Sequence, residues 1–212
     1  MPGPTNRANS HIKHNPPKNA GKPAFSIRGM ILCAIFAALT AVLAQVSVPA
    51  PGGVPVTMQT FAVLLAGIAL GSRKGFAATA VYLLLGAAGL PVFAGFSGGF
   101  QKFAGPTGGF LLSFPVTAFA AGLSAELIYD RLKGRLGLLF CSLGVLAAVA
   151  VNYACGMAVY CAVTGAGPAK AAAVCVLPFI VPDLLKAAGA VAVGTAVRDR
   201  VTGKRAAEKT RG

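Results

Sequence analysis

The sequence predicts an all-α integral membrane protein with six transmembrane helices and both termini in the cytoplasm. Composition is the first observation: 56% of the 212 residues are hydrophobic and only 11% are charged, against about 25% in a typical soluble domain. The second is that the apolar residues form long runs, separated by short basic or glycine-rich connections. The third is the distribution of the basic residues among these connections.

Six apolar runs are the expected transmembrane helices, since a membrane span needs about 20 apolar residues, more or less. Before them, residues 1–24 are rich in proline, asparagine and lysine, and we expect a disordered basic cytoplasmic tail there. Residues 25–198 then form the membrane domain, and residues 199–212 form a second basic cytoplasmic tail. The runs cover residues 27–48, 59–70, 76–90, 110–128, 136–163 and 171–197.

The lysines and arginines orient these helices. Six spans place both termini on one side. All but three of the 19 basic residues lie in the tails, next to them at Arg28 and Arg198, or in the connections after the second and fourth runs. Basic residues gather on the cytoplasmic side of a membrane protein. We therefore expect a multi-pass protein of the cell membrane whose proline- and glycine-rich connections, 48–58 and 91–109, face outward.

The sequence also excludes several functions. The net charge of +14 is not arranged as a basic patch interleaved with aromatic residues, so anionic lipid is an expected partner and nucleic acid is not. Both histidines lie in the N-terminal tail and no two cysteines form a C-x-x-C pair, so we expect no metal site and no cofactor. Gly95–Gly99 matches G-x-S-x-G, but without a histidine in the membrane domain an enzyme is not expected. Because the chain has no P-loop, it has no ATP site of its own.

Asp183 and Lys186 are the strongest candidate site, because opposite charges occur three residues apart in an otherwise apolar run. If Arg198 marks the cytoplasmic edge, Asp183 lies roughly 22 Å above it at helical rise, in the outer third of the membrane. Pro182 suits the first turn of a helix, whose positively polarised end favours an anion. The two charges could bind a small polar molecule; the alternative is an ion pair that only holds helices together.

The connection 91–109 is expected to cover an outward-facing cavity. It carries four phenylalanines, and an exposed aromatic segment usually packs against another surface. Its glycines, which include Gly98 and Gly99, allow the backbone to approach a ligand closely. The alternative is a loop without fixed structure.

Two further features concern contacts between helices. Ala34 and Ala38 are small residues four positions apart, which lets another helix approach closely, although an alanine-rich helix without such a partner would have the same pattern. Asn152 and Tyr153 are polar residues within the fifth run. A membrane helix must satisfy such groups inside the protein.

Five short motifs are weak individually and specific as a set. They are Val54-Pro-Val-Thr-Met-Gln-Thr60, Gly71-Ser-Arg-Lys-Gly75, Gly89-Leu-Pro-Val-Phe-Ala-Gly95 with Ser97-Gly-Gly99, Gly105-Pro-Thr-Gly-Gly109, and Pro178-Phe-Ile-Val-Pro-Asp-Leu-Leu-Lys186. In this order and spacing they resemble the BioY family, the biotin-specific S components of energy-coupling factor (ECF) transporters. The resemblance extends from Ile27 to about Val197.

The resemblance implies a six-helix fold that holds biotin near the outer face, and coupling to a membrane T component and two ATPase subunits. It also implies that Asp183 and Lys186 contact the ligand and that the face with Ala34 and Ala38 docks on the T component. Gln59 and Thr107 lie within the matching motifs and join the expected contact set.

Biotin has ureido N–H donors, a carbonyl acceptor, an apolar ring and a carboxylate. We expect Asp183 to accept from the ureido N–H groups, since a charged acceptor forms the stronger bond. Lys186 and Asn152 would donate to the ureido oxygen or to the carboxylate, and both assignments remain open. Phe93 and Phe96 would cover the apolar ring. An alternative function is a stand-alone carrier of biotin or another small vitamin, driven by an ion gradient with Asp183 as the ion site.

Overall fold

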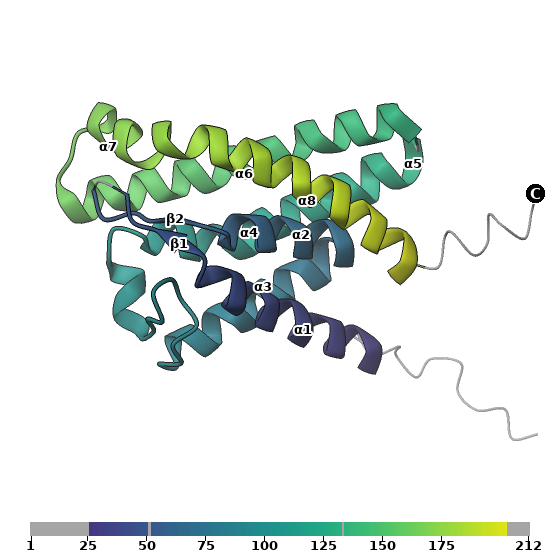
Figure 1. Ribbon diagram of the computed structural model, residues 1–212, viewed down its shortest axis with the longest axis horizontal. Coiled ribbons are helices and arrows are strands. Elements are labelled where there is room, and N and C mark those ends of the chain that lie inside the picture. Colours follow the sequence, from purple (N-terminus) through teal and green to yellow (C-terminus); the bar gives the residue numbers. More distant parts are fainter. Residues whose placement is uncertain (1–25, 51, 133, 203–212) are drawn as a thin grey trace, which may run out of the picture.

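The computed structural model describes residues 26–50, 52–132 and 134–202, which form a bundle of helices along one long axis (Figure 1). The expected tails 1–24 and 199–212 lie almost entirely outside the described residues. Each of the six predicted apolar runs contains one long helix, although the first run ends in a strand and the sixth is broken at residues 176–179. These helices are α1 (Ile27–Ala44), α2 (Gln59–Leu70), α3 (Ser72–Ala87), α4 (Gly108–Ser124), α6 (Gly134–Thr164) and α8 (Ile180–Val201).

Shorter elements extend or connect these helices. α4 continues through the π-helical turn Ala125–Tyr129 into α5 (Asp130–Leu132). α7 (Pro168–Cys175) and a 3-10 turn (Leu177–Phe179) precede α8, and a second 3-10 turn, Phe100–Ala104, lies in the connection before α4. Within the described residues, four stretches are long and apolar enough to cross a membrane, judged by length and composition: Ile27–Ala44, Gly108–Leu132, Gly134–Thr164 and Pro168–Val201.

α2 is the central helix of the bundle, which explains why it is short. It has 12 residues, and all except Phe61 are buried, because α1, α3, α4 and α8 pack around it. At about 1.5 Å per residue α2 is only about 18 Å long. Helices of unequal length thus occupy the six predicted runs, and α2, which is almost entirely covered by protein, is too short to be counted among the spans; six membrane crossings remain a prediction.

Glycines allow α2 and α3 to pack closely. Gly71, with φ of +88°, lies between the two helices and reverses the chain, a conformation that residues with a Cβ rarely adopt. A Cβ placed on Gly75 would lie 2.6 Å from the Cα of Gly67, so the two backbones touch. The sequence pattern Gly67-x-x-x-Gly71 thus marks a close packing of helices at Gly67 and a turn at Gly71.

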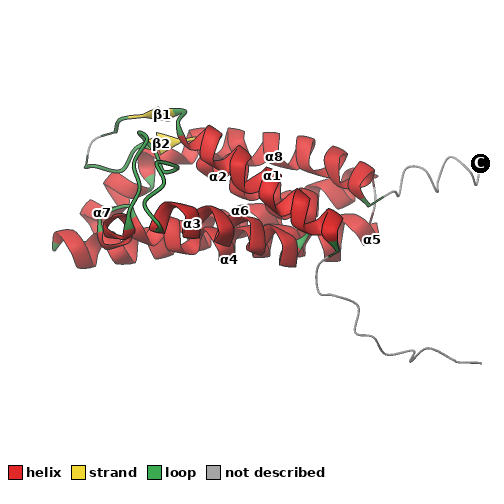
Figure 2. Cartoon of the chain, turned by 90° about the horizontal axis from the view of Figure 1, so that it is seen from below, coloured by secondary structure: helices red, strands yellow, loops and turns green. Residues whose placement is uncertain are grey.

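A short β-hairpin corrects the all-α prediction. β1 (Ser47–Val48) pairs antiparallel with β2 (Val56–Thr57), so that Ser47 is opposite Thr57. Two-residue strands between prolines and glycines carry no readable alternation of polar and apolar residues, which is why the sequence indicated only a loop. The hairpin and the longer loops lie at the end of the bundle away from the chain termini (Figure 2).

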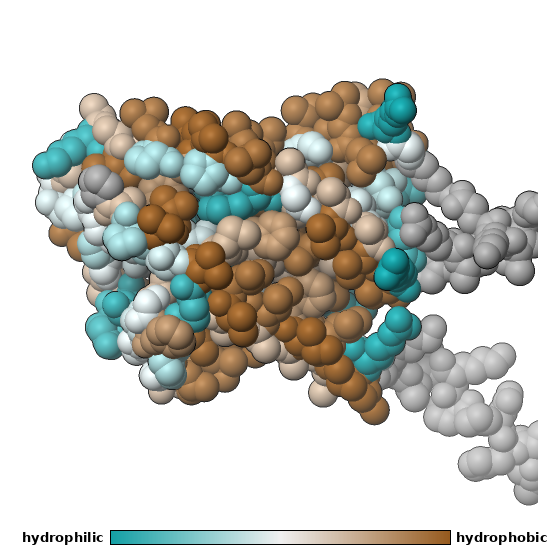
Figure 3. Space-filling model, viewed as in Figure 1, coloured by the Kyte–Doolittle hydropathy of each residue, from teal (hydrophilic) through white to brown (hydrophobic). Residues whose placement is uncertain are grey.

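The two ends of the molecule differ in charge. We call the end at which α1 begins and α8 ends the terminal end, and the opposite end, with the hairpin and α7, the cavity end (Figure 1). Apolar residues cover most of the face in Figure 3, and hydrophilic ones border it at both ends. Described basic residues at the terminal end are Arg28, Arg73, Lys74, Arg131, Arg135, Arg198 and Arg200. Lys102 and Lys170 lie at the cavity end.

Ionic hydrogen bonds join the helices at the terminal end. Arg198, which is 4% exposed, donates through Nε and Nη2 to both carboxylate oxygens of Asp130 at 3.1 and 2.8 Å. Its Nη1 donates to the backbone oxygen of Ile68 at 3.0 Å. Glu126 accepts from the N–H and the hydroxyl of Ser72 at 2.9 and 2.7 Å. These bonds connect α8, α5, α2, α3 and the extension of α4.

Candidate functional site

A cavity of about 240 Å³ opens at the cavity end of the bundle. The hairpin, the start of α2, the connection 91–107, α4, α6 and α8 each contribute to its wall. Of the residues expected from the sequence, Asp183, Lys186, Asn152, Phe93, Thr107 and Gln59 line it. The volume lies just below the range of about 300–1,000 Å³ that is usual for small-molecule sites. The cavity therefore suits a compact ligand.

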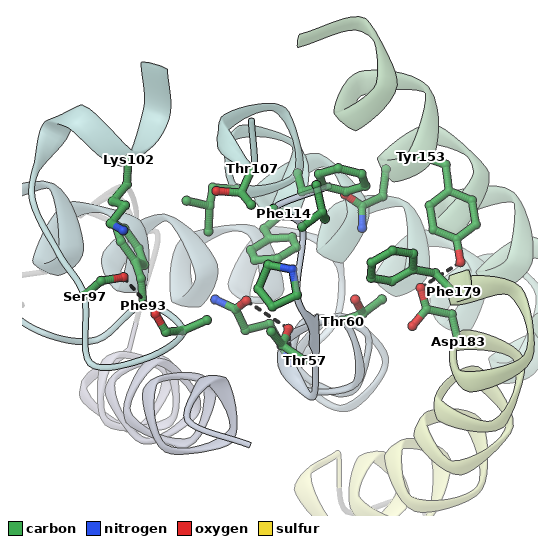
Figure 4. A pocket seen from close by; sticks show the side chains of 18 of the residues that line it. Thr57, Thr60, Phe93, Ser97, Lys102, Thr107, Phe114, Tyr153, Phe179 and Asp183 are labelled. Carbon is green, nitrogen blue, oxygen red and sulfur yellow. Dashed lines mark hydrogen bonds between the residues drawn. The ribbon is translucent and has the colours of Figure 1, made fainter. Parts of the chain in front are cut away.

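Asp183 is the centre of the charged side of the cavity. Its Oδ1 accepts a hydrogen bond from Lys186 Nζ at 2.7 Å, and its Oδ2 accepts one from the hydroxyl of Tyr153 at 2.7 Å. Figure 4 shows the bond from Tyr153 and the ring of Phe179 beside the carboxylate. Asp183 and Lys186 are 3% and 8% exposed. The pair is thus buried within the protein but lines a cavity, as expected for charges at membrane depth.

The local sequence explains the position of Asp183. The chain leaves helical geometry at Val176, where φ is −122°, passes through a 3-10 turn and restarts as α8 at Ile180. Pro182 lies within the first turn, where no intrahelical N–H is needed. Asp183 is therefore in the first turn of α8, where backbone N–H groups favour a negative charge. The helix starts two residues before Pro182, close to the expected position.

Asn152 enters the cavity from α6 and is 2% exposed. The hydroxyl of Ser113 on α4 lies 2.6 Å from its Oδ1, a distance typical of an O–H···O hydrogen bond. Its amide nitrogen has no partner among the described residues. Since Asn152 lines the cavity, this nitrogen is a donor available to a ligand.

Gln59 also lines the cavity, but its carboxamide is already engaged. Its Nε2 donates to the hydroxyl of Tyr82 at 2.5 Å, and its Oε1 accepts from Thr57 at 2.9 Å. Tyr82, which is fully buried, donates in turn to the backbone oxygen of Val92 at 3.2 Å. Gln59 thus belongs to a network that joins β2, α2 and α3 to the connection 91–107.

The phenylalanines of this connection fall into two groups. Phe93 is 2% exposed, lines the cavity and packs edge-on against Tyr82 and Phe103 with ring centroids 5.5 and 5.7 Å away. Phe96 and Phe100 are 73% and 74% exposed and do not line it. Of the two rings expected to cover a ligand, Phe93 therefore lies in the cavity wall and Phe96 lies outside it. The turn that exposes Phe96 was not visible in the sequence.

Gln45 fixes this turn. Phe93 and Ser97 pair through N–H···O bonds of 2.8 and 3.3 Å, and Phe96 between them has φ of +52°, which is rare for a bulky residue. The Oε1 of Gln45, the C-cap residue of α1, accepts from Phe96 N–H at 2.8 Å. Its Nε2 donates to the backbone oxygens of Ala41 and Phe93 at 3.0 and 3.2 Å. Gln45 therefore attaches a wall of the cavity to α1.

Gly98 and Gly99 were expected to let the backbone approach a ligand, but they lie behind the cavity wall. Gly98 and Gly99 are not among the residues that line the cavity. Gly99, with φ of +96°, donates its N–H to the backbone oxygen of Gly86 at 2.7 Å. A Cβ on Gly98 would collide with the backbone oxygen of Leu90. Both glycines fold the connection against the end of α3 and so support the wall from behind.

Sequence reasoning missed several lining residues. Tyr153 was expected only to be a polar residue within a membrane helix, not a residue of the site. Its position next to Asn152 was the signal that could have placed it there. Lys102 was visible as one of the few basic residues on the expected outer side. The aromatic residues Phe110, Phe114 and Phe179 line the cavity without any signal that separates them from ordinary core residues.

Ala34 and Ala38 lie outside the cavity. Both are exposed on α1 and neither lines the cavity. Among the residues that the structure describes, no group of three potential metal ligands lies together.

A helical bundle with an apolar outer face and a cavity that buries an ion pair defines a multi-pass membrane protein able to hold a small polar solute. The sequence matches the BioY family over residues 16–203. The chain belongs to the BioY family, a family of transport proteins. The matched region starts earlier than the resemblance from Ile27 suggested, within the expected N-terminal tail.

Relatives match over most of their length. The "Probable biotin transporter BioY" of Pyrococcus horikoshii is 45% identical over 162 residues, which cover 76% of this chain and 91% of that protein. The "Biotin transporter BioY" of Rhizobium etli is 37% identical over 178 residues, or 81% and 94% of the two chains. A crystal structure of the S-component for biotin from an ECF-type ABC transporter shares the fold. Its TM-score is 0.71 at 24% identity, over 82% of this chain and 92% of that one.

Proposed function

We propose that the chain is the biotin-binding S component of an ECF-type uptake transporter. The observation that carries the proposal is the cavity in which Asp183, Lys186 and Asn152 come together. Membership of the BioY family and the names of the relatives support biotin as the ligand. The protein itself would bind the vitamin and carry out no covalent chemistry.

The polar groups of the cavity suit a ureido ring. A carboxylate has room for about four hydrogen bonds, so Asp183 can accept from a ligand N–H while it retains Lys186 and Tyr153. Lys186 has three N–H donors, of which one is used on Asp183. The free amide nitrogen of Asn152 adds a further donor, and the ring of Phe93 offers apolar surface to the rest of the ligand.

The charge difference between the two ends supports an outward-facing cavity. Basic residues concentrate at the terminal end, which by the positive-inside rule belongs to the cytoplasm. The cavity end would then receive biotin from outside the cell. Inward release would use a T component, docked on the α1 face that carries Ala34 and Ala38, and two ATPase subunits, because this chain has no P-loop.

Binding of labelled biotin to the purified protein tests the ligand and the site. Asp183→Asn and Lys186→Met each break a buried, hydrogen-bonded charge pair, and we expect the affinity to fall about ten- to hundredfold, or 1.4–3 kcal/mol. Asp130→Asn is the matched control, since it alters the ion pair with Arg198 at the terminal end of the molecule and should leave the affinity unchanged. Wild-type affinity in both cavity variants, or no binding by the unaltered protein, would contradict the proposal.

Transport assays separate this function from an ion-driven carrier. Buried Asp183 could also serve as a proton site, which is the observation that favours the alternative. In proteoliposomes, we expect uptake to require the ATPase partners and ATP and to survive a protonophore. Uptake by this chain alone that a protonophore abolishes would support the carrier instead.

A further inference from the structure

Lys102 is a second cation of the cavity. It lies in the 3-10 turn Phe100–Ala104, lines the cavity and is half-buried. Its backbone takes part in turn hydrogen bonds with Gly99 and Gly105, but its ammonium group has no hydrogen-bond or ion-pair partner among the described residues. An unpaired lysine that points into a partly enclosed space is a binding group for an anion.

The other charges of the cavity leave Lys102 unbalanced. Lys186 and Asp183 neutralise each other across 2.7 Å. Lys102 is the remaining charged residue of the lining, so the described cavity carries one net positive charge. A ligand with a single negative charge complements this arrangement.

Lys102 and Asp183 lie on opposite sides of the cavity (Figure 4). Between them lie the aromatic rings of Phe93, Phe114 and Phe179, together with the polar side chains of Thr57, Thr60 and Thr107. One side therefore offers paired charges and amide donors to a neutral polar group, the middle offers apolar surface, and the other side offers a free ammonium group. The order of these surfaces matches a ligand with a hydrogen-bonding head, an apolar middle and an anionic end.

We propose that Lys102 binds the carboxylate of the ligand and thereby fixes the direction in which the ligand lies. The inference rests on the proposed function, since it takes biotin as the ligand. The ureido ring then lies at Asp183 and Asn152, and the aliphatic chain passes the phenylalanines toward Lys102. Lys102 selects a ligand with a free carboxylate, while Asp183 selects the ring.

The test compares biotin with biotinamide, in which a neutral amide replaces the carboxylate. Binding of both is measured with the purified full-length protein, Lys102→Gln and Lys102→Arg. The unaltered protein should prefer biotin about five- to twentyfold, a modest factor because Lys102 is half-exposed. Lys102→Gln should reduce this preference to about twofold or less, through weaker binding of biotin, with biotinamide affinity unchanged. Lys102→Arg should retain most of the preference.

Lys170→Gln is the matched control. Lys170 is the other basic residue of the cavity end; it is exposed on α7 and does not line the cavity. The same loss of charge there should leave both affinities unchanged. A loss of preference in Lys170→Gln equal to that in Lys102→Gln would mean that overall surface charge attracts the anion, and the inference would be wrong.

The remaining outcomes are also decisive. If Lys102→Gln binds both ligands as the unaltered protein does, the carboxylate lies elsewhere and the inference fails while the proposed function stands. If it weakens both ligands equally, Lys102 acts only through the shape of the connection, and the inference again fails. Failure of the unaltered protein to bind biotin at all would overturn the proposed function itself.

Discussion

Tyr153 fixes the orientation of the Asp183 carboxylate, because it adds a second hydrogen bond to the one from Lys186. With Lys186 on one oxygen and Tyr153 on the other, both at 2.7 Å, the carboxylate cannot rotate without breaking a charged hydrogen bond. Such bonds are roughly twice as strong as neutral ones. The orientation of Asp183 is therefore set before a ligand arrives, which lowers the entropic cost of binding.

Tyr153→Phe tests this role, because it removes the hydroxyl and keeps the ring. We expect biotin affinity to fall about five- to tenfold, since Asp183 loses one of its two partners and becomes mobile. Tyr160→Phe, in the same helix but not in the cavity lining, is the control and should bind as the unaltered protein does. Titration with labelled biotin measures both; equal affinities in the two variants would mean that Tyr153 does not orient Asp183.

At the scale of elements, the connection 91–107 is held by partners from three helices. Gln45 at the end of α1 binds the backbone oxygens of Val92 and Phe93 and the N–H of Phe96. Tyr82 on α3 binds Val92 from the other side and is linked to Gln59 on α2. The wall of the cavity is thus an ordered turn, and its shape depends on side chains outside the cavity.

Gln45→Leu should release this turn while keeping the volume of the side chain. The variant loses several hydrogen bonds worth about 0.5–1.5 kcal/mol each, so amide hydrogen exchange at residues 92–97 should accelerate and bound biotin should dissociate faster. Gln101→Leu is the control, because Gln101 is exposed and its side chain donates a hydrogen bond to the oxygen of Gly98 within its own turn. Unchanged exchange at residues 92–97 in Gln45→Leu would show that the turn is held by other contacts.

The packing of α2 against α3 depends on a glycine. Gly75→Ala places a methyl group against the backbone of Gly67, and we expect a loss of about 1–3 kcal/mol in the free energy of unfolding in detergent. Gly167→Ala makes the same change where no atom lies within 4 Å of the new Cβ, so it should have little effect. If both variants unfold alike, the close approach at Gly75 does not contribute to stability.

The elements that the sequence predicted are those encoded by long apolar runs. The helices and the position of Asp183 near a helix start followed from hydrophobicity, proline placement and charge spacing. The hairpin could not be predicted, because its two-residue strands show no alternation of polar and apolar residues. The outward turn at Phe96 could not be predicted either, because it depends on Gln45, which is distant from it in sequence and carries no local signal. For the same reason Tyr153 and Lys102 were recognised as cavity residues only once the helices were assembled.

At the scale of the whole molecule, the cavity and the exposed face of α1 are separate. Ala34 and Ala38 are exposed on α1, whereas the residues of α1 that meet the cavity wall, Gln45 and the buried Ala37, belong to another face or to the end of the helix. Small exposed residues at this spacing permit a close helix contact. We therefore expect that solute binding and the proposed docking on a membrane partner can be altered independently.

Ala34→Leu combined with Ala38→Leu should abolish uptake and leave biotin binding intact, because the larger side chains prevent a partner helix from approaching. Ala150→Leu combined with Ala154→Leu is the control, since these alanines are exposed on α6 with the same spacing. Uptake by cells and binding by purified protein are both measured. A double leucine variant of α1 that transports normally would argue against docking at this face.

The burial of α2 within the protein has a consequence for the effect of the surrounding membrane. A helix covered almost entirely by other parts of the protein need not match the thickness of the lipid bilayer, which acts on α1, α4, α6 and α8 instead. Gln59 and Thr60, which open α2 beneath the cavity, are therefore shielded from changes in acyl-chain length. Solute binding should vary little between thin and thick membranes. Steps that move the outer helices against a partner should depend on the thickness of the membrane.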